Sequence, residues 1–101
     1  MIIHYELEER IDSSNAQEVE QTLMNNLKLF EDEIERIEFN AVNLKYMSSS
    51  GLKILLKCVK IWKNISIINA SELIQTLLET VGFTEFIKVN EPIENVKENK
   101  R

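Results

Sequence analysis

The sequence predicts an α/β fold in which three or more helices pack against a mixed, largely parallel sheet of four to five strands. Apolar residues alternate between a period of two and a helical period along the chain, and helical stretches of roughly 10 to 15 residues separate the strands. Connections of that length are crossovers that join parallel strands. The 101 residues, 44% of them hydrophobic, are enough for one core.

The first expected strand begins at the N-terminus and ends near Ile11. Apolar and polar side chains alternate there, in the order Ile3, His4, Tyr5, Glu6, Leu7 and Glu8. The cap-forming residues 12–15 follow, and a helix is expected from about Asn15 to Leu29. Its buried face is predicted to carry Ala16, Val19, Leu23, Met24 and Leu27.

An acidic linker, residues 31–33, precedes a second strand, which the apolar pattern places at about 36–41 with an extended approach to three serines. A helix that includes residues 52–61 follows. Three lysines recur on it at about one-turn intervals and predict one basic stripe on an otherwise apolar helix. These lysines are Lys53, Lys57 and Lys60. Cys58 falls within the apolar run and is interpreted as a core residue.

The β-branched run 65–68 predicts a further strand, and Ser71 is the expected N-cap of a third helix. Gly82 ends that helix in the left-handed conformation that glycine permits. The apolar residues Phe83, Phe86, Ile87 and Val89 predict a final short strand. We therefore expect one domain over residues 1–90 and a polar tail over 91–101, either frayed or forming a short helix.

Composition narrows the function classes. The net charge of -5 disfavours nucleic acid and anionic membranes as partners, because both require clustered basic residues. A single cysteine and a single histidine predict no disulfide framework, no metal site and no cofactor. No basic-then-apolar leader and no run of about 18 apolar residues is found, so we expect a cytoplasmic protein. No acid–base or nucleophilic set is recognisable, so an enzyme is not expected.

Three consecutive hydroxyls, Ser48, Ser49 and Ser50, stand where the strand pattern gives way to the helical one. The first turn of a helix has unpaired N–H groups and the positive end of the macrodipole, so a phosphoserine is well accommodated there. Serine is also a preferred N-cap, and a serine cluster before a helix often does nothing more. Both interpretations remain open from the residues alone.

Four segments in the right order carry a family resemblance. Residues 10–16 (Arg-Ile-Asp-Ser-Ser-Asn-Ala) are similar to an early Gly-x-Leu-Asp-x-x-x-Ala segment, and 37–40 to a central strand. Residues 46–52 (Tyr-Met-Ser-Ser-Ser-Gly-Leu) are similar to an Asp-Ser-Ser-Gly signature, and 79–83 to the end of a late helix. With these segments the chain resembles the STAS domain family of bacterial anti-sigma factor antagonists over about Ile3 to Val89, and a STAS-like fold is implied.

The resemblance implies a function without catalysis. Ser50 would be phosphorylated by an anti-sigma factor that is also a serine kinase, and reset by a serine phosphatase, while Asp12 is the acidic residue beside it. The unphosphorylated form would bind the kinase and free the sigma factor, so that the protein regulates transcription. Besides Ser50, the partner-binding residues implied are Asp12, Ser48, Ser49, Gly51 and Lys53. The alternative is a STAS scaffold or sensing module that binds a protein partner without phosphorylation.

The chain departs from the family pattern in three places. Ser48 stands where the signature has aspartate, and Glu9 stands where glycine is usual. The chain also begins close to the second family strand, so the first strand is expected to be missing or very short. An exposed sheet edge would result, and such an edge can pair with another chain. We therefore include a homodimer among the expectations.

Overall fold

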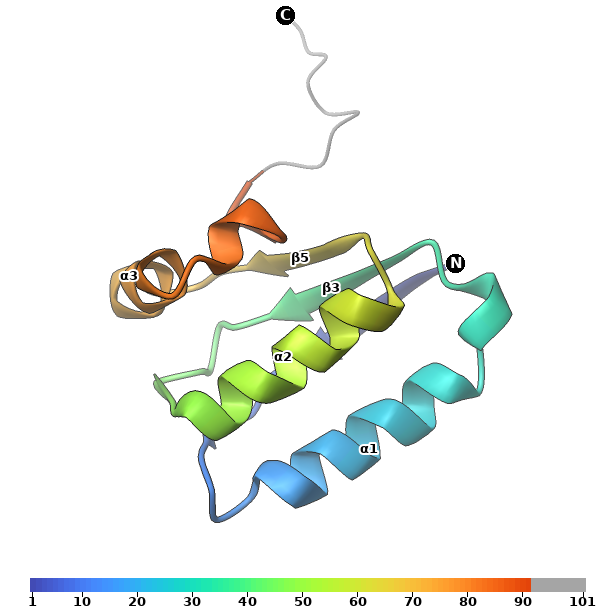
Figure 1. Cartoon of the computed structure of the whole chain (residues 1–101), viewed down its shortest axis with the longest axis horizontal. Helices are drawn as coiled ribbons and strands as arrows, with labels where there is room; N and C mark the ends of the chain where they lie inside the picture. Colours follow the sequence, from blue (N-terminus) through green and yellow to red (C-terminus); the bar gives the residue numbers. More distant parts are fainter. Residues whose placement is uncertain (92–101) are drawn as a thin grey trace, which may run out of the picture.

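The structure is a computed structural model, and it describes residues 1–91. The expected tail therefore lies outside the described residues except for Glu91. The elements follow one another in the expected alternation (Figure 1). They are β1 (Ile2–Glu6), β2 (Arg10–Ile11), α1 (Ala16–Lys28), the 3-10 turn η1 (Glu31–Glu33), β3 (Arg36–Asn40), β4 (Tyr46–Met47), α2 (Ser49–Ile61), β5 (Ile65–Ile68), α3 (Glu72–Thr80), the 3-10 turn η2 (Phe83–Glu85) and β6 (Lys88–Val89).

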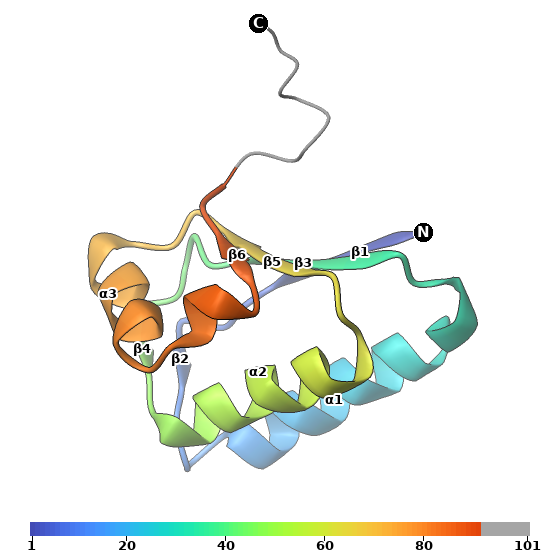
Figure 2. The ribbon, with the colours of Figure 1, turned by 45° about the horizontal axis from the view of Figure 1, so that its top comes forward.

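The main sheet has four strands in the order β1-β3-β5-β6, and all its pairings are parallel. Each crossover therefore steps in the same direction across the sheet. Because crossovers between parallel strands are right-handed, steps in a single direction place every connecting helix on the same face. Figure 2 shows this arrangement, with α1, α2 and α3 on one side of the sheet and none on the other. The α/β fold with three helices and a parallel sheet is thus confirmed.

The covered face of the sheet forms the core with the helices. Ile37 and Phe39 of β3 are fully buried there, as is Cys58 of α2. The predicted core position of Cys58 is confirmed, and burial, helped by the negative charge of Glu20, raises the pKa of its thiol to about 12. A thiol with so high a pKa is not a nucleophile near neutral pH.

The caps expected for α3 are confirmed. The Ser71 hydroxyl accepts a hydrogen bond from the Ile74 amide at 3.2 Å, which pairs one of the unbonded donors of the first turn. Gly82 follows the helix with φ of 85°, a left-handed conformation that side chains disfavour.

Two predicted strands are wrong in part. The first strand does not continue to Ile11: β1 ends at Glu6, where its partner β3 also ends, and the chain turns before β2 pairs elsewhere with β4. The expected strand does not begin at Phe83: Phe83–Glu85 form the 3-10 turn η2, because the Phe83 carbonyl accepts hydrogen bonds from the amides of Phe86 and Ile87. Only Lys88 and Val89 are extended.

One edge of the main sheet is β1, which pairs with β3 on one side. Within residues 1–91 no strand pairs with its other side. The exposed edge behind the expected homodimer is therefore present, while the homodimer itself stays a prediction.

The uncovered face of the sheet carries a polar row that runs across all four strands. Its members are His4, Glu38, Ser66 and Lys88, which lie in register. The His4 Nδ1 and Glu38 Oε1 atoms are 2.8 Å apart. The hydroxyl of Ser66 is buried and has no hydrogen-bond partner within residues 1–91.

Replacing Ser66 with alanine is expected to stabilise the protein, because an unpaired buried hydroxyl costs free energy that the methyl group does not. We expect a gain of about 1 kcal/mol, or roughly 4–8 °C in Tm, by thermal unfolding. Ser71→Ala is the matched control: it removes a serine whose hydroxyl is bonded, and it should lower the stability by about 1 kcal/mol. A loss of stability in both variants contradicts the prediction.

Candidate functional site

The candidate site is built on a second, two-stranded sheet. Its strands β2 and β4 are parallel, with Arg10 paired to Tyr46 and Ile11 paired to Met47. The Ser48 amide then donates to the Ile11 carbonyl at 2.9 Å. This pairing joins two segments that are far apart in the sequence. Asp12 and Ser48 directly follow the last pair of the two strands and therefore lie side by side. Both were predicted site residues.

Ser48 is the N-cap of α2. Its hydroxyl accepts a hydrogen bond from the Ser50 amide at 3.2 Å, and its carbonyl accepts bonds from the amides of Gly51 and Leu52. The helix therefore begins at Ser49, three residues before the apolar stretch that starts at residue 52. Ser49 is exposed and Ser50 half-buried, and within residues 1–91 neither hydroxyl has a hydrogen-bond partner.

Gly51 lies in the first turn of α2 and is buried against the two-stranded sheet. A Cβ atom at this position would lie 2.6 Å from Met47 Cγ and 3.0 Å from Ile11 Cγ2. Because real Cβ atoms do not approach other atoms so closely, only glycine lets the helix start this near to the ladder. Gly51 is thus a packing residue that fixes where Ser49 and Ser50 lie, rather than a residue exposed to a partner.

Asp12 occupies the turn between β2 and α1. One carboxylate oxygen accepts bonds from the Ser14 amide and hydroxyl, at 2.9 Å and 2.5 Å. The other lies 3.0 Å from the Arg10 guanidinium. The bonds from Ser14, with the charge of Arg10, lower the pKa of the Asp12 carboxyl, so that it is ionised at neutral pH.

This lowered pKa predicts a pH-dependent contribution to stability. A carboxyl with a depressed pKa in the folded state stabilises the protein above its unfolded pKa of about 3.9, and the contribution is lost as the pH falls through the lower folded value. We expect the Tm deficit of Asp12→Asn to be largest near neutral pH and to shrink below about pH 4. Ser14→Ala should reproduce part of the deficit. A constant difference between pH 7 and pH 3 contradicts the assignment.

Two residues beside the site were not predicted, Arg10 and Tyr46. The Arg10 guanidinium lies 5.6 Å from the centre of the Tyr46 ring, within the range of a cation–π contact, and it also pairs with Asp12. The Tyr46 side chain is half exposed. Both residues stand in the segments that carry the family resemblance, but their contact depends on the register of two strands, which the sequence does not display.

The lysines of α2 differ in their surroundings. Lys57 Nζ lies 2.6 Å from Glu20 Oε2 of α1, so this lysine joins the two helices. Lys53 is exposed and lies one helical turn after Ser50. At a spacing of three residues, side chains on one helix are neighbours. The predicted basic stripe therefore keeps a charge at Lys53 close to the serines, while the charge of Lys57 is already paired.

Within residues 1–91, no group of three or more histidine, cysteine and acidic side chains is placed to hold a metal ion. No helix in this part of the chain is long and apolar enough to span a bilayer.

Comparison with known proteins gives a consistent result. The family model described as the STAS domain matches residues 1–98. No protein of curated function matches the chain significantly.

Two similar solved structures are of SpoIIAA. The anti-sigma factor antagonist SpoIIAA in its unphosphorylated form has a TM-score of 0.66 and 15% identity, over 95% of this chain and 84% of that one. The Bacillus cell fate determinant SpoIIAA in the phosphorylated form has a TM-score of 0.63 and 15% identity, over 95% and 86%. At this identity the likeness establishes the shared fold.

Proposed function

The chain belongs to the STAS domain family, and from that membership we propose that it is a cytoplasmic anti-sigma factor antagonist switched by phosphorylation of Ser50. In its unphosphorylated form it binds an anti-sigma factor that is also a serine kinase, and the sigma factor is released to act in transcription. A serine phosphatase resets the switch. The protein itself contributes a binding surface and no catalysis.

The observation that supports this proposal most is the position of Ser50. It is half exposed in the first turn of a 13-residue helix, and its hydroxyl has no partner within residues 1–91. Its amide is already bonded to the Ser48 hydroxyl, which holds the turn in place. A phosphate there would face the positive end of the helix dipole and would be stabilised.

The charge of a phosphate supports a change in binding. Phosphorylation adds about -1.5 to -2 charges at neutral pH. Lys53 lies three residues further along α2, where its side chain can reach such a phosphate. It would then form an ion pair with the phosphate instead of contacting a partner. Arg10 already balances the ionised Asp12 at the end of the adjoining ladder, and the phosphate charge exceeds the single positive charge of Lys53, so the surface around Ser50 would become net negative. A partner with its own carboxylates, docked here before phosphorylation, would be repelled.

The other residues expected to bind a partner, besides Ser50 and Asp12, fall into two groups. Ser49 and Lys53 are exposed and can contact a partner directly. Ser48 and Gly51 act through the helix start, one as the cap and the other by close packing. We therefore propose that the surface presented to the kinase comprises Ser49, Ser50 and Lys53, with the Arg10–Asp12–Tyr46 cluster beside them.

The proposal is tested by intact-mass measurement and phosphopeptide mapping. The protein is isolated from its own cells, and separately incubated with ATP and a candidate anti-sigma kinase. We expect one added phosphate, located on Ser50 and lost in Ser50→Ala. Phosphate on Ser48 or Ser49 instead, or no phosphate under either condition, contradicts the switch.

A binding module without phosphorylation is the second candidate, and the cap bond from Ser48 favours it. That bond gives the serine cluster a structural role that requires no kinase. In this case Lys53→Glu should weaken partner binding while Ser50 variants do not, with Lys28→Glu, at the far end of α1, as the matched charge control. Unaltered binding in Lys53→Glu removes this surface from consideration.

A further inference from the structure

The outer edge of β1 carries a row of unpaired backbone groups. The Leu7 amide, just after the strand, donates to the Asn40 carbonyl at 2.9 Å, so the odd-numbered residues of this segment face β3. Successive residues in a strand direct their N–H and C=O groups to opposite edges. The even-numbered residues Ile2, His4 and Glu6 therefore turn theirs away from β3, to a side where no strand pairs with them within residues 1–91.

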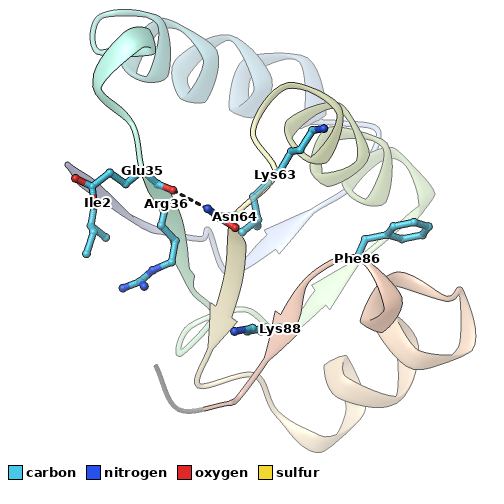
Figure 3. A pocket seen from close by; sticks show the side chains of 8 residues that line it. Ile2, Glu35, Arg36, Lys63, Asn64, Phe86 and Lys88 are labelled. Atoms are coloured by element: carbon cyan, nitrogen blue, oxygen red, sulfur yellow. Dashed lines mark hydrogen bonds between the residues drawn. The ribbon is translucent and has the colours of Figure 1, made fainter. Parts of the chain in front are cut away.

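This edge lacks the features that usually prevent strands from pairing. Natural edge strands are very short, contain lysine or proline, or are interrupted by a bulge. The edge strand β6 at the other side of the sheet has only two residues, whereas β1 has five, contains neither lysine nor proline, and pairs with β3 in an unbroken register. Ile2, labelled at the start of β1 in Figure 3, is 41% exposed.

The polar side chains of β1 are also held back from the edge. The Glu6 carboxylate accepts a hydrogen bond from the Asn43 side chain at 2.7 Å, and His4 Nδ1 lies 2.8 Å from Glu38 Oε1. Each of these contacts directs the side chain toward a residue of its own chain. The backbone groups of the edge are therefore left free for another strand.

The open groups of β1 are complementary to those of a second copy of β1. When the two strands run antiparallel about a two-fold axis at His4, His4 faces the partner's His4 and Ile2 faces the partner's Glu6. All the open residues then meet open residues, and each facing pair exchanges two hydrogen bonds. A shift of two residues in either direction would leave one open residue of each copy unpaired. The register about His4 is thus the one that satisfies most groups.

The side chains between the open residues favour the same register. Ile3 and Tyr5 are half-buried and pack against the core on the face covered by the helices. The Tyr5 ring meets Phe39 edge-on, with the ring centres 6.1 Å apart, which holds it in place. In the register about His4, Ile3 lies opposite the partner's Tyr5. A β-branched residue opposite an aromatic one is a favourable cross-strand pair, and it would cover surface that each copy now exposes.

Helix α1 presents short, uncharged side chains on its flank nearest to this edge. Its other flank faces α2, because Glu20 is bonded to Lys57, and Figure 1 shows α2 between α1 and β5. The helical period places Thr22 and Asn26 on the flank away from α2, and both are exposed. In the antiparallel pair the two copies of α1 approach each other with these side chains, so no like charges are brought together there.

We propose that β1 pairs antiparallel with β1 of a second copy, about a two-fold axis at His4, and joins two four-stranded sheets into one of eight strands. The helices of both copies then lie on the same face. The interface is small, and each chain carries a net charge of -5, so the dimer is weak. We expect a Kd of about 10–100 µM that decreases as salt screens the charges. Residues 2–6 lie outside the serine surface, so pairing does not depend on phosphorylation.

Oxidative cross-linking of the full chain tests the register. In His4→Cys the two facing Cα atoms would lie about 5.5 Å apart, within the range of a disulfide. Glu6→Cys is the matched control, because its two copies would lie about 14 Å apart. We expect a covalent dimer of His4→Cys and none of Glu6→Cys, while a mixture of Ile2→Cys and Glu6→Cys forms heterodimers. The unmodified protein should not cross-link, because Cys58 is buried.

A second pair of variants tests the backbone hydrogen bonds. His4→Pro removes an N–H group that faces the open edge, where an edge strand tolerates proline. Sedimentation velocity should show dimerisation weakened by at least about tenfold, while His4→Gln, which keeps the N–H group, should dimerise like the unmodified protein. Thermal unfolding shows whether each variant remains folded.

Three results would overturn the proposal. They are equal cross-linking at positions 4 and 6, a folded His4→Pro variant that dimerises like His4→Gln, and a protein that stays monomeric at about 1 mM. The last result is expected if another segment fills the edge, such as residues 92–101 or a strand of a different protein. Ser50→Ala should dimerise like the unmodified protein, so a failure here leaves the serine switch untouched, and the reverse also holds.

Discussion

Ser50→Asp is expected to weaken binding to the proposed anti-sigma kinase by at least about tenfold, while Ser50→Ala should bind it like the unmodified protein. Aspartate places a permanent charge at the half-exposed position in the first turn of α2, beside Lys53 and close to the ionised Asp12. Docking would then bury that charge or oppose it with a like charge, and both cost binding free energy. Titration calorimetry with a candidate kinase measures the effect.

A second aspartate variant tests whether the effect is specific to Ser50 or reflects general charge repulsion. Thr76→Asp adds the same charge at an exposed position on α3, outside the surface proposed for the kinase, and should weaken binding much less. An acidic residue in the first turn of a helix is favourable, so Ser50→Asp should not lose stability. If both Ser50 variants bind like the unmodified protein, or if Thr76→Asp has the larger effect, Ser50 is not the switch.

Gly51→Ala is expected to cost about 1–3 kcal/mol of stability, the range for overpacking a well-packed core. The added methyl group would lie 2.6 Å from Met47 Cγ and 3.2 Å from Ile11 Cβ. Both neighbours are almost completely buried and are held in the two-stranded ladder, so they have little room to withdraw. Each 1 kcal/mol should lower Tm by roughly 4–8 °C in a domain of this size.

Two further variants test the cause of this loss. Ser49→Ala makes a similar replacement on the exposed side of the same turn and should change stability by less than about 0.5 kcal/mol. Met47→Ala removes the nearest contact, so adding Gly51→Ala to it should cost less than Gly51→Ala costs alone. Additive losses in the double variant would mean that the clash with Met47 is not the cause.

The sequence predicts the regular parts of the fold well because they depend on local patterns. The helical period of the apolar residues predicted α1 to within a residue at each end, and the caps at Ser71 and Gly82, which need only short-range bonds, bounded α3. The predictions fail where contacts between distant segments set the structure. Apolar and polar residues alternate up to residue 11, but β1 ends where its partner strand β3 ends. The first apolar residues after Gly82 form a helical turn, so the last strand begins later than expected.

In the candidate site too, local features could be predicted from the sequence and contacts between distant segments could not. Ser48 as a helix cap and the position of the serines at a helix start follow from neighbouring residues. Arg10 and Tyr46 meet across a ladder, and the bond between Lys57 and Glu20 joins two helices, so neither contact has a local signature. Arg36, Lys63 and Lys88 line one pocket at the amino ends of the strands (Figure 3), and only the folded sheet brings these three positions to one place.

The ladder between β2 and β4 is only two residues long on each strand and is separate from the main sheet. Because only a few hydrogen bonds hold this ladder, we expect it to open locally at a free energy well below that of global unfolding. In hydrogen exchange, the Ser48 amide, bonded to Ile11, should exchange long before the amides of Ile37 and Phe39 in the middle of the sheet. Ser50, half exposed in the closed ladder, would then become fully accessible to a kinase during a brief opening while the rest of the domain stays folded.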